Sequence, residues 1–583
     1  MSNLQKLLLI FGGFVSYMLA DGYTYSIGVL YSELMNAFHL SSVETAILPG
    51  MIFSMPQFFA PFLCPLLETY GFSSGSAWGA LLMWTGCFVS SFANNFHILY
   101  LTLGVLTSIG LQLTYLSALM SVTAQFEDSP FFGIAVGLTM CGSGVGAFAS
   151  NYLLAWLLNS WSWREVLFIE SAILLNILVT ASCSHHLDAE LNTQLLIKRQ
   201  SFYSDNMEDK HCPIQCNSEK HHANGCTVKK YFWNSIRFCL CFPSLFRFRT
   251  YQLLPSHSNN LSISIEYNDQ DATNNQRVVS LNNSNKLLSC ACPQFMHSFG
   301  SNYKKLFSPK LWKNPNFLFY VIANGITGAG VVIPWTFIYD YVLTTLSHLE
   351  DQNLINSVST KDISWLPSLI GFGLLFGQLF YGLITSQFGD ICIYCKNTNQ
   401  ECNAKDASFC YRSNRSQTAA TKRCTASKYQ FHLIVFLITL LLNSASTLTI
   451  ALVPLKSIQS ETKQLELFSH REGKLLALAC FFVGMSNGGL YVMFPQLIID
   501  IVGADLWSPG LGLFLTFNGF MNLCGTNIGG QIYDTRGSYE IAFVIAAFLP
   551  LIAFLLMIIK EVFTWLIKGS ASSANPNSSQ EQI

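Results

Sequence analysis

Long apolar runs recur along the whole chain, and each has to be buried in lipid or in a very large core. A helix of roughly 20 apolar residues crosses about 30 Å of hydrocarbon. The runs fall at 6–32, 44–67, 76–93, 96–124, 131–157 and 165–183, and again at 317–345, 363–388, 430–455, 474–500, 509–533 and 540–560. This pattern predicts an all-α membrane protein with twelve transmembrane helices in two six-helix bundles.

The composition excludes several classes of protein. Only 11% of the 583 residues are charged, whereas ordinary soluble domains carry about 25%. A net charge of −1 argues against a nucleic-acid partner. The chain has no G-x-x-x-x-G-K-[ST] phosphate loop, which disfavours an ATP-driven pump. No paired catalytic groups are recognisable, so we expect neither an enzyme nor a cofactor.

The apolar runs divide the chain into two halves. We expect an N-terminal bundle at 1–183, a largely disordered central loop at 184–316 and a C-terminal bundle at 317–560. The second bundle would contain a Cys-rich loop at 389–428, and a tail would follow at 561–583. Six spans, a long polar loop and six more spans are the plan of a secondary transporter built from repeated halves.

The distribution of basic residues predicts the orientation. If both termini are cytoplasmic, most of the 32 Lys and Arg residues lie on the cytoplasmic side, as the positive-inside rule requires. Cytosolic loops would keep their cysteines reduced and leave the sequons at Asn260, Asn282 and Asn414 unused. The opposite placement would make both features meaningful, but the charge distribution favours cytoplasmic termini in a multi-pass plasma-membrane protein.

The central loop holds one segment of unusual composition. Residues Lys229 to Arg249 mix basic and aromatic side chains, a combination that suits the anionic inner surface of a membrane. Cys239 and Cys241 are candidates for acylation, and a linker without function is the alternative. The His and Cys residues at 211–226 fit no common zinc spacing, so we expect no metal site.

Asp21 interrupts the first apolar run. A charge at the bilayer centre costs roughly 2.5–3.5 kcal/mol on insertion scales, so it should face a cavity or a partner. Asp21, Tyr25, Gly28 and Ser32 share one helical stripe of small or polar residues. Asp21 therefore either orients a cationic or zwitterionic substrate, or carries a proton, or bonds a neighbouring helix in a purely structural role.

Further polar residues lie within apolar helices. Gln378 shares a stripe with small residues of the eighth run, and Tyr115, Asn487 and Asn518 lie in other runs. Each can contact a substrate, and hydrogen bonding between helices is the alternative. Glycines four residues apart in the fifth and eighth runs predict close helix packing.

Several motifs resemble known transporters. "GLITSQFG" (382–389) has the glycine spacing of a loop motif of the major facilitator superfamily. "LADGYTYSIGVLYSELMNAF" (19–38), "GIAVGLTMCGSGVGAF" (133–148), "WSWREVLFI" (161–169) and "GGQIYDTRGSYEIAF" (529–543) resemble segments of the monocarboxylate transporter family, especially its non-lactate and orphan members. The resemblance implies structural roles for Gly22, Gly137, Gly142, Gly146, Trp163, Gly382, Gly389, Gly530, Asp534 and Gly537.

The departures from that family concern its charged residues. The family's proton-coupled lactate carriers have a lysine in the first helix, where this chain has Tyr25, and an Asp/Arg pair in the eighth, where it has Leu374 and Gln378. Arg164 is the one clear cation left, near the end of the fifth or sixth run, where we expect it to pair with Glu170. Capture of a small carboxylate would lose its usual partners.

The resemblance implies a secondary transporter of a small organic solute, facilitative rather than a lactate/proton symporter. The alternative is a transport-inactive membrane receptor or scaffold whose cytoplasmic loop recruits partners. We expect the solute and the lipid bilayer as partners, and the family allows a single-span ancillary glycoprotein. The candidate translocation residues are Asp21, Tyr25, Tyr115, Arg164, Gln378, Asn487 and Asn518.

The predicted orientation can be tested by cysteine accessibility. Cysteines placed at 260 or 414 should resist an impermeant thiol reagent added to intact cells and react after permeabilisation, because both positions would face the cytosol. Labelling of either position from outside intact cells would contradict the orientation.

Overall fold

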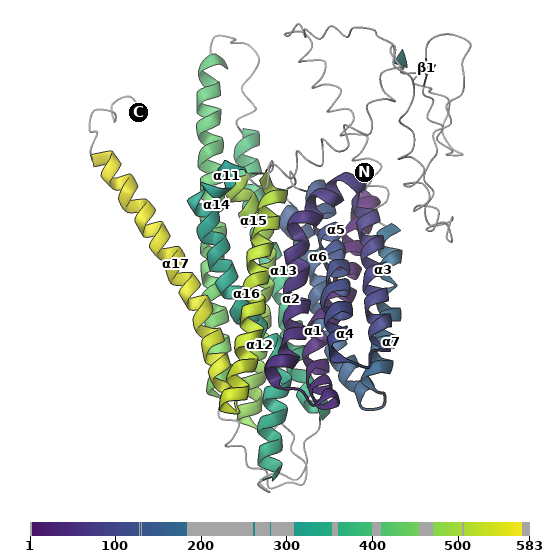
Figure 1. The fold of residues 1–583 in the computed structure, drawn as a ribbon. Helices are drawn as coiled ribbons and strands as arrows, with labels where there is room; N and C mark the ends of the chain where they lie inside the picture. Colours follow the sequence, from purple (N-terminus) through teal and green to yellow (C-terminus); the bar gives the residue numbers. More distant parts are fainter. Residues whose placement is uncertain are drawn as a thin grey trace, which may run out of the picture. The chain divides into compact units, whose positions relative to one another are not determined.

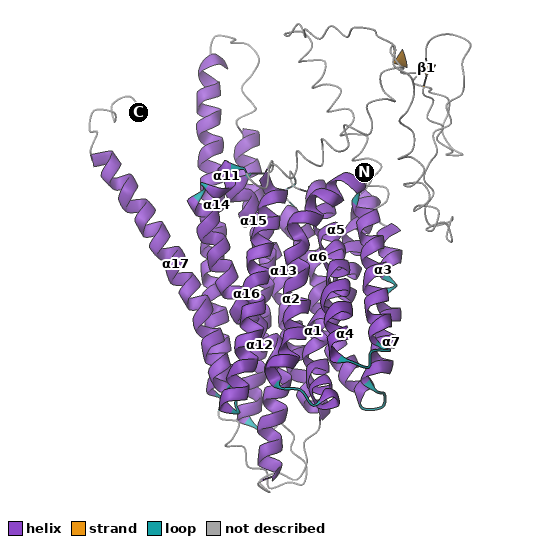
Figure 2. Ribbon diagram, viewed as in Figure 1, coloured by secondary structure: helices purple, strands orange, loops and turns teal. Residues whose placement is uncertain are grey.

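The structure is a computed structural model that describes residues 3–126, 129, 131–182, 308–351, 360–398, 410–453, 470–503 and 506–573, with two short strands at 261–262 and 280–281. The described part is almost entirely helical (Figures 1 and 2). The basic and aromatic segment 229–249, its two cysteines and the His/Cys cluster at 211–226 lie outside the described residues.

The first half of the chain forms six membrane helices, one of which is built from three consecutive pieces. They are α1 (Asn3–Phe38), α2 (Ser42–Tyr70), α3 (Phe72–Ser90), the run of α4 (Phe96–Leu99), η1 (Tyr100–Thr107) and α5 (Ser108–Phe126), α6 (Phe132–Leu158), and α7 (Trp163–Leu174), whose span continues to Ser182.

The second half forms six more. They are α12 (Pro315–Asp351), preceded by the short α11 (Pro309–Trp312), then α13 (Thr360–Thr398), α14 (Cys410–Leu452), α15 (Arg471–Val502), α16 (Trp507–Arg536) and α17 (Glu540–Ser573). Ten of the described helices are long and apolar enough to cross a membrane by themselves. The Ser- and Gly-rich α3 and the polar-rich α16 complete the predicted twelve.

The helices are longer than the apolar runs suggested. We expected a loop at 389–428, but α13 continues to Thr398 and α14 begins at Cys410. Similarly, α17 continues to Ser573, into the expected tail. A hydropathy pattern marks the part of a helix that lies in hydrocarbon, and a helix can extend past it into water or headgroups.

Between residues 193 and 298 the structure describes only two short strands. There, β1 (Leu261–Ser262) pairs antiparallel with β2 (Ser280–Leu281), so that Leu261 lies opposite Leu281.

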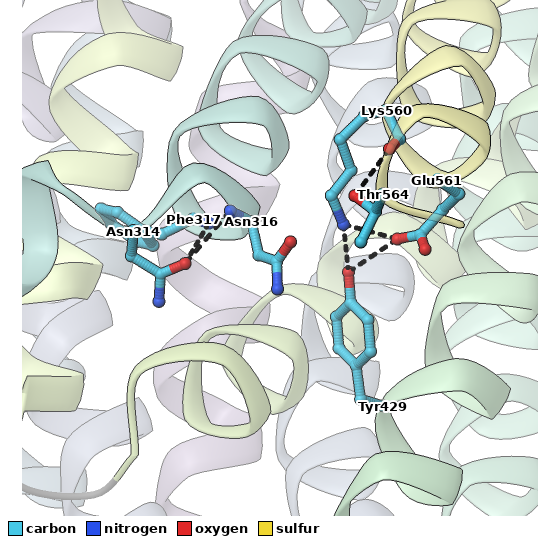
Figure 3. A network of polar contacts seen from close by, with 7 residues as sticks. All are labelled: Asn314, Asn316, Phe317, Tyr429, Lys560, Glu561 and Thr564. Atoms are coloured by element: carbon cyan, nitrogen blue, oxygen red, sulfur yellow. Dashed lines mark hydrogen bonds and ion pairs between the residues drawn. The ribbon is translucent and has the colours of Figure 1, made fainter. Parts of the chain in front are cut away.

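Local sequence signals begin several helices. Ser41 and Glu44 form a capping box at the start of α2, and Ser162 and Glu165 form another at the start of α7. Asn314 Oδ1 accepts hydrogen bonds from the backbone N–H groups of Asn316 and Phe317 at 3.1 and 3.3 Å, which caps α12 (Figure 3).

Glycines let the helices within each half approach closely. Side chains at Gly142 and Gly146 of α6 would collide with the backbone carbonyls of Phe14 and Met18 in α1, and Gly22 lies against Gly146. In the second half, Gly373 and Gly377 of α13 similarly face the backbone of α15. Close backbone approach supplies the van der Waals contact that holds helices together in lipid.

Glycines also line the two seams between the halves. Along α6 and α13, a Cβ at Gly137 would lie 3.1 Å from the Cα of Gly382. Along α2 and α16, a Cβ at Gly530 would lie 3.0 Å from the Ser42 carbonyl oxygen. These seams flank the central space that α1 and α12 also border.

We name the two ends of the helical unit by α1: the N side, where Asn3 lies, and the far side, where α1 ends at Phe38. Several contacts between the halves lie on the far side. The rings of Tyr25 and Trp335 are 4.1 Å apart, and a Cβ at Gly28 would lie 2.6 Å from the Trp335 carbonyl oxygen. Asp534 accepts hydrogen bonds from the backbone N–H groups of Ser42 and Val43 at 3.1 and 3.0 Å.

These contacts join the two halves on the far side. The Asp534 carboxylate lies at the N-terminus of α2, where a negative charge is favourable. Tyr31 of α1 also lies 3.4 Å from the Tyr539 hydroxyl, which donates to Asp340 at 2.8 Å.

A polar cluster joins α14 to α17 on the N side (Figure 3). Lys560 is buried, and its Nζ donates to Glu561 at 2.5 Å and to the Tyr429 hydroxyl at 3.2 Å. The Tyr429 hydroxyl donates in turn to Glu561 at 3.3 Å. The lysine is therefore satisfied within the second half.

The packing of α1 on α6 predicts the effect of one substitution. Gly142→Leu should sharply reduce the fraction of monodisperse protein and lower its melting temperature, because the new side chain meets backbone that cannot move aside; overpacking typically costs about 1–3 kcal/mol or more. Ala149→Leu on the exposed face of the same helix is the control and should be tolerated. Equal behaviour of the two variants in size-exclusion and thermal assays would contradict the packing.

Candidate functional site

A cavity lies at mid-depth between the two halves. Its walls come from α1, α2, α5 and α6 of the first half and from α12, α13, α15 and α16 of the second. The space is about 150 Å³, enough for on the order of ten water molecules at roughly 15 Å³ each. It can therefore hold a small hydrated solute.

Asp21 lies on the α1 wall of this cavity, and its carboxylate is held by two hydroxyl donors. The Tyr115 hydroxyl of α5 donates to Oδ1 at 2.6 Å, and Ser143 of α6 donates to Oδ2. The Tyr115 hydroxyl also lies 2.9 Å from Thr24 Oγ1. The carboxylate thus ties α1 to α5 and α6 while it borders the cavity, so its geometry fits both the structural and the substrate-binding interpretation.

Aromatic rings cover the end of the cavity that faces the far side. Tyr25 stacks near Trp335 and also approaches Phe53 at 5.8 Å between ring centroids. Tyr491 of α15 lines the same cavity. Tyr17 and Tyr115 stack at 5.5 Å on the first-half wall. All of these aromatic side chains line the cavity.

Amide side chains form a hydrogen-bonded chain across the opposite wall. Asn324 of α12 donates to Asn518 of α16 at 3.3 Å, and Asn518 donates to Gln57 of α2 at 2.9 Å. Because Gln57 belongs to the first half and Asn518 to the second, this chain links the two halves at the level of the cavity.

Two buried polar atoms of lining residues have no partner within the described part of the chain. They are the Gln378 Oε1 acceptor and the Trp335 Nε1 donor, in side chains that are each 1% exposed. An unpaired buried polar group is costly. A solute that offers one donor and one acceptor would satisfy both.

The lining carries a single ionisable acid. Asp21 is that residue, and no Lys, Arg or His is among the described residues that form the walls. The electrostatic character of the site is therefore set by one carboxylate, many hydroxyl and amide groups, and aromatic faces.

Five of the seven residues predicted from the sequence meet at this cavity: Asp21, Tyr25, Tyr115, Gln378 and Asn518. The residues of the predicted α1 stripe do not all face the cavity. Asp21 and Tyr25 line it, whereas Gly28 packs against α12. The structure places the other two predicted residues, Arg164 and Asn487, elsewhere.

Arg164 lies at the start of α7, towards the far side. Its Nη2 donates to the Ala93 carbonyl at 3.0 Å, and its guanidinium lies 4.3 Å from the Trp163 ring centroid. The expected ion pair with Glu170 is absent from the contacts of these two described residues. A backbone carbonyl and an aromatic ring satisfy the guanidinium instead, so Arg164 has a structural position in the first half.

Asn487 is fully buried between α15 and α14. Its Oδ1 accepts from Asn443 Nδ2 at 2.7 Å, and Asn443 also donates to Ser486 at 2.8 Å. This is the interhelical bonding that we gave as the alternative. A polar residue in an apolar helix can face the cavity or a neighbouring helix, and the sequence alone did not distinguish them.

Sequence reasoning missed several lining residues. Asn324, Asn522 and Gln57 could have been found as amides within apolar helices, by the reasoning that found Asn518. Ser143 lies among the glycines of α6, and Trp335 and Tyr491 look like ordinary core aromatics, so no sequence signal distinguished them.

The structure places three further motif positions. Trp163 is buried and contacts Phe38 at 5.5 Å between ring centroids. Gly537 ends α16 with a φ of 67°, a left-handed conformation that favours glycine. Gly389 lies within α13.

The position of Arg164 predicts that it does not select the solute. Arg164→Gln should reduce the yield of folded protein, because it removes the contact with Ala93 and Trp163. At matched protein levels, the KM of any transported solute should differ from that of the unmodified chain by no more than about twofold. The substitution should remove no contact between the protein and the solute. Vesicle uptake measures this, and a rise in KM of tenfold or more would place Arg164 in the binding site.

Comparisons with known proteins agree with this architecture. A family model described as Major Facilitator Superfamily matches residues 9–394. Monocarboxylate transporter 14 of Mus musculus is 22% identical over 555 residues, which cover 95% of this chain and 89% of that protein. Its Homo sapiens counterpart is 22% identical over 95% of this chain and 90% of its own length.

A shorter match is more similar in sequence. Monocarboxylate transporter 12 of Rattus norvegicus is 30% identical over 172 residues, which cover 30% of this chain and 35% of that protein. The chain belongs to the Major Facilitator Superfamily, as a monocarboxylate transporter-like solute transporter that spans the membrane several times and is not an enzyme.

Proposed function

We propose that the chain carries a small neutral, zwitterionic or cationic organic solute by facilitated, alternating-access transport. The charge of the cavity is the observation that supports this most strongly. Its described lining holds one carboxylate, Asp21, and no basic side chain. Such a site suits a solute that needs no cation from the protein.

Proton-coupled lactate transport fits this cavity poorly. A carboxylate substrate needs a cation to balance its charge in a low-dielectric site. Tyr25 and Gln378 occupy the positions where lactate carriers have basic residues, and both line the cavity. Their hydroxyl and amide groups can hydrogen-bond a solute but cannot neutralise it, and an ionised Asp21 would repel lactate.

In alternating access, the two halves would move relative to each other. In this proposal residues 1–183 and 317–560 rock about the cavity, and the termini lie in the cytoplasm of a plasma-membrane protein. The far-side contacts of Asp534 with α2 and of Tyr25 with Trp335 support a form closed on that side. The glycine seams allow the halves to slide while they stay in contact.

The alternative is a receptor or scaffold without transport. The long segment between the halves and the loss of the lactate carriers' charged residues favour it. The cavity between the halves, lined by Asp21 and several amide and hydroxyl side chains, favours transport. A single-span ancillary glycoprotein would be compatible with either function.

Uptake measurements test the proposed function. Cells or vesicles that contain the chain should take up at least one solute from a panel of carboxylates, amino acids and amines, and should take up lactate poorly and without stimulation by external acid. Rapid lactate uptake stimulated by acid would contradict the proposal. No uptake from the whole panel, despite confirmed surface expression, would favour the receptor.

The role of Asp21 has its own test. Asp21→Asn should reduce transport by about tenfold or more while surface levels remain largely intact, because the amide keeps the size of the side chain but removes its charge. Glu165→Gln, at an exposed acid of α7, is the control and should transport normally. Normal transport by Asp21→Asn would leave this carboxylate with only a structural role.

A further inference from the structure

We propose that the solute is a small protonated amine that lacks a carboxylate group. This inference rests on the proposed transport function and names its substrate class. It follows from the charge of the cavity, from the way Asp21 is held, and from the polar atoms that lack partners.

The charge of the cavity distinguishes a simple amine from a zwitterion. A protonated amine balances Asp21, so the complex carries no net charge through the membrane. An amino acid brings a second carboxylate, for which the described lining offers no cation. That group would be left unpaired and would be repelled by Asp21.

Asp21 remains able to accept hydrogen bonds in its observed position. Each carboxylate oxygen has two lone pairs, and Tyr115 and Ser143 use one on each oxygen. An ammonium group can therefore bond to Asp21 without displacing the two hydroxyls. Thr24, bonded to the Tyr115 hydroxyl, helps to fix that hydroxyl and so the carboxylate.

Aromatic rings around Asp21 favour a cation further. Tyr17, Tyr25 and Tyr491 line the same cavity as Asp21. A cation within about 6 Å of an aromatic face is attracted to it. Tyr25 and Trp335, whose ring centroids are 4.1 Å apart, both line this cavity.

The unpaired Gln378 Oε1 selects for a nitrogen that bears hydrogens. This buried acceptor lacks a donor among the described residues, and an N–H of a primary or secondary amine can supply one. A quaternary ammonium cannot. The unpaired Trp335 Nε1 donor would bind a hydroxyl, ether or carbonyl oxygen elsewhere in the solute.

Equilibrium binding to the purified full chain tests the proposal with matched probes. The first set is phenethylamine, phenylalanine and 2-phenylethanol, and the second is ethanolamine, serine and ethylene glycol. The amine of at least one set should bind about tenfold more tightly than both its zwitterionic and its neutral partner. N,N,N-trimethylphenethylammonium should bind more weakly than phenethylamine.

Two variants assign the recognition to the cavity. Asp21→Asn should weaken amine binding by about tenfold while the neutral probe is unaffected. Gln378→Met should weaken the primary amine but not the trimethylated one. Glu165→Gln is the control and should bind every probe as the unmodified chain does.

The outcomes separate this inference from the proposed function. Tightest binding by the zwitterionic or neutral probes, or no saturable binding by either amine, would overturn the inference. Amine binding that survives Asp21→Asn would overturn it as well. If the amine binds as expected but is not taken up into vesicles, the inferred ligand class holds and the proposed transport function is wrong. If another solute is taken up and no amine binds, the transport function holds and the inferred ligand class is wrong.

Discussion

The carboxylate of Asp21 is held in the middle of the membrane by hydroxyls from two neighbouring helices. Tyr115 and Ser143 supply hydrogen bonds but no positive charge. A buried charge that is bonded but not neutralised is costly unless water or a ligand shares its site. The cavity beside Asp21 provides that space. The preference for positive charge that we propose for the cavity follows from this one residue.

Close helix packing makes this arrangement possible. Glycines of α6 bring it against α1, which places Ser143 beside Asp21. Other glycines form the seams between the halves and leave the cavity between them. On the far side, Asp534 of the second half accepts hydrogen bonds from the N-terminus of α2 in the first half. Movement of either half would break this contact. In the proposed transport cycle, the same small residues would position the binding groups and permit the halves to move.

The sequence predicted the helices and the class of protein well, because a membrane-spanning helix has a characteristic length and apolar composition that can be recognised in the sequence. It also placed Asp21, Tyr25, Tyr115, Gln378 and Asn518, whose polarity is conspicuous in apolar runs. Arg164 and Asn487 lie away from the cavity, and polarity alone does not reveal which neighbour satisfies a side chain. Ser143 and Trp335 were missed because their role comes from tertiary contacts with distant helices.

The most direct test of this account is a cryo-electron microscopy map of the full chain with saturating phenethylamine. The account predicts density for the ligand in the central cavity, with its nitrogen within hydrogen-bond distance of Asp21 and its ring against the aromatic wall of Tyr25 and Trp335. Density with the nitrogen directed away from Asp21, or a ligand bound only outside the cavity while Asp21 keeps its two hydroxyl partners, would contradict the account.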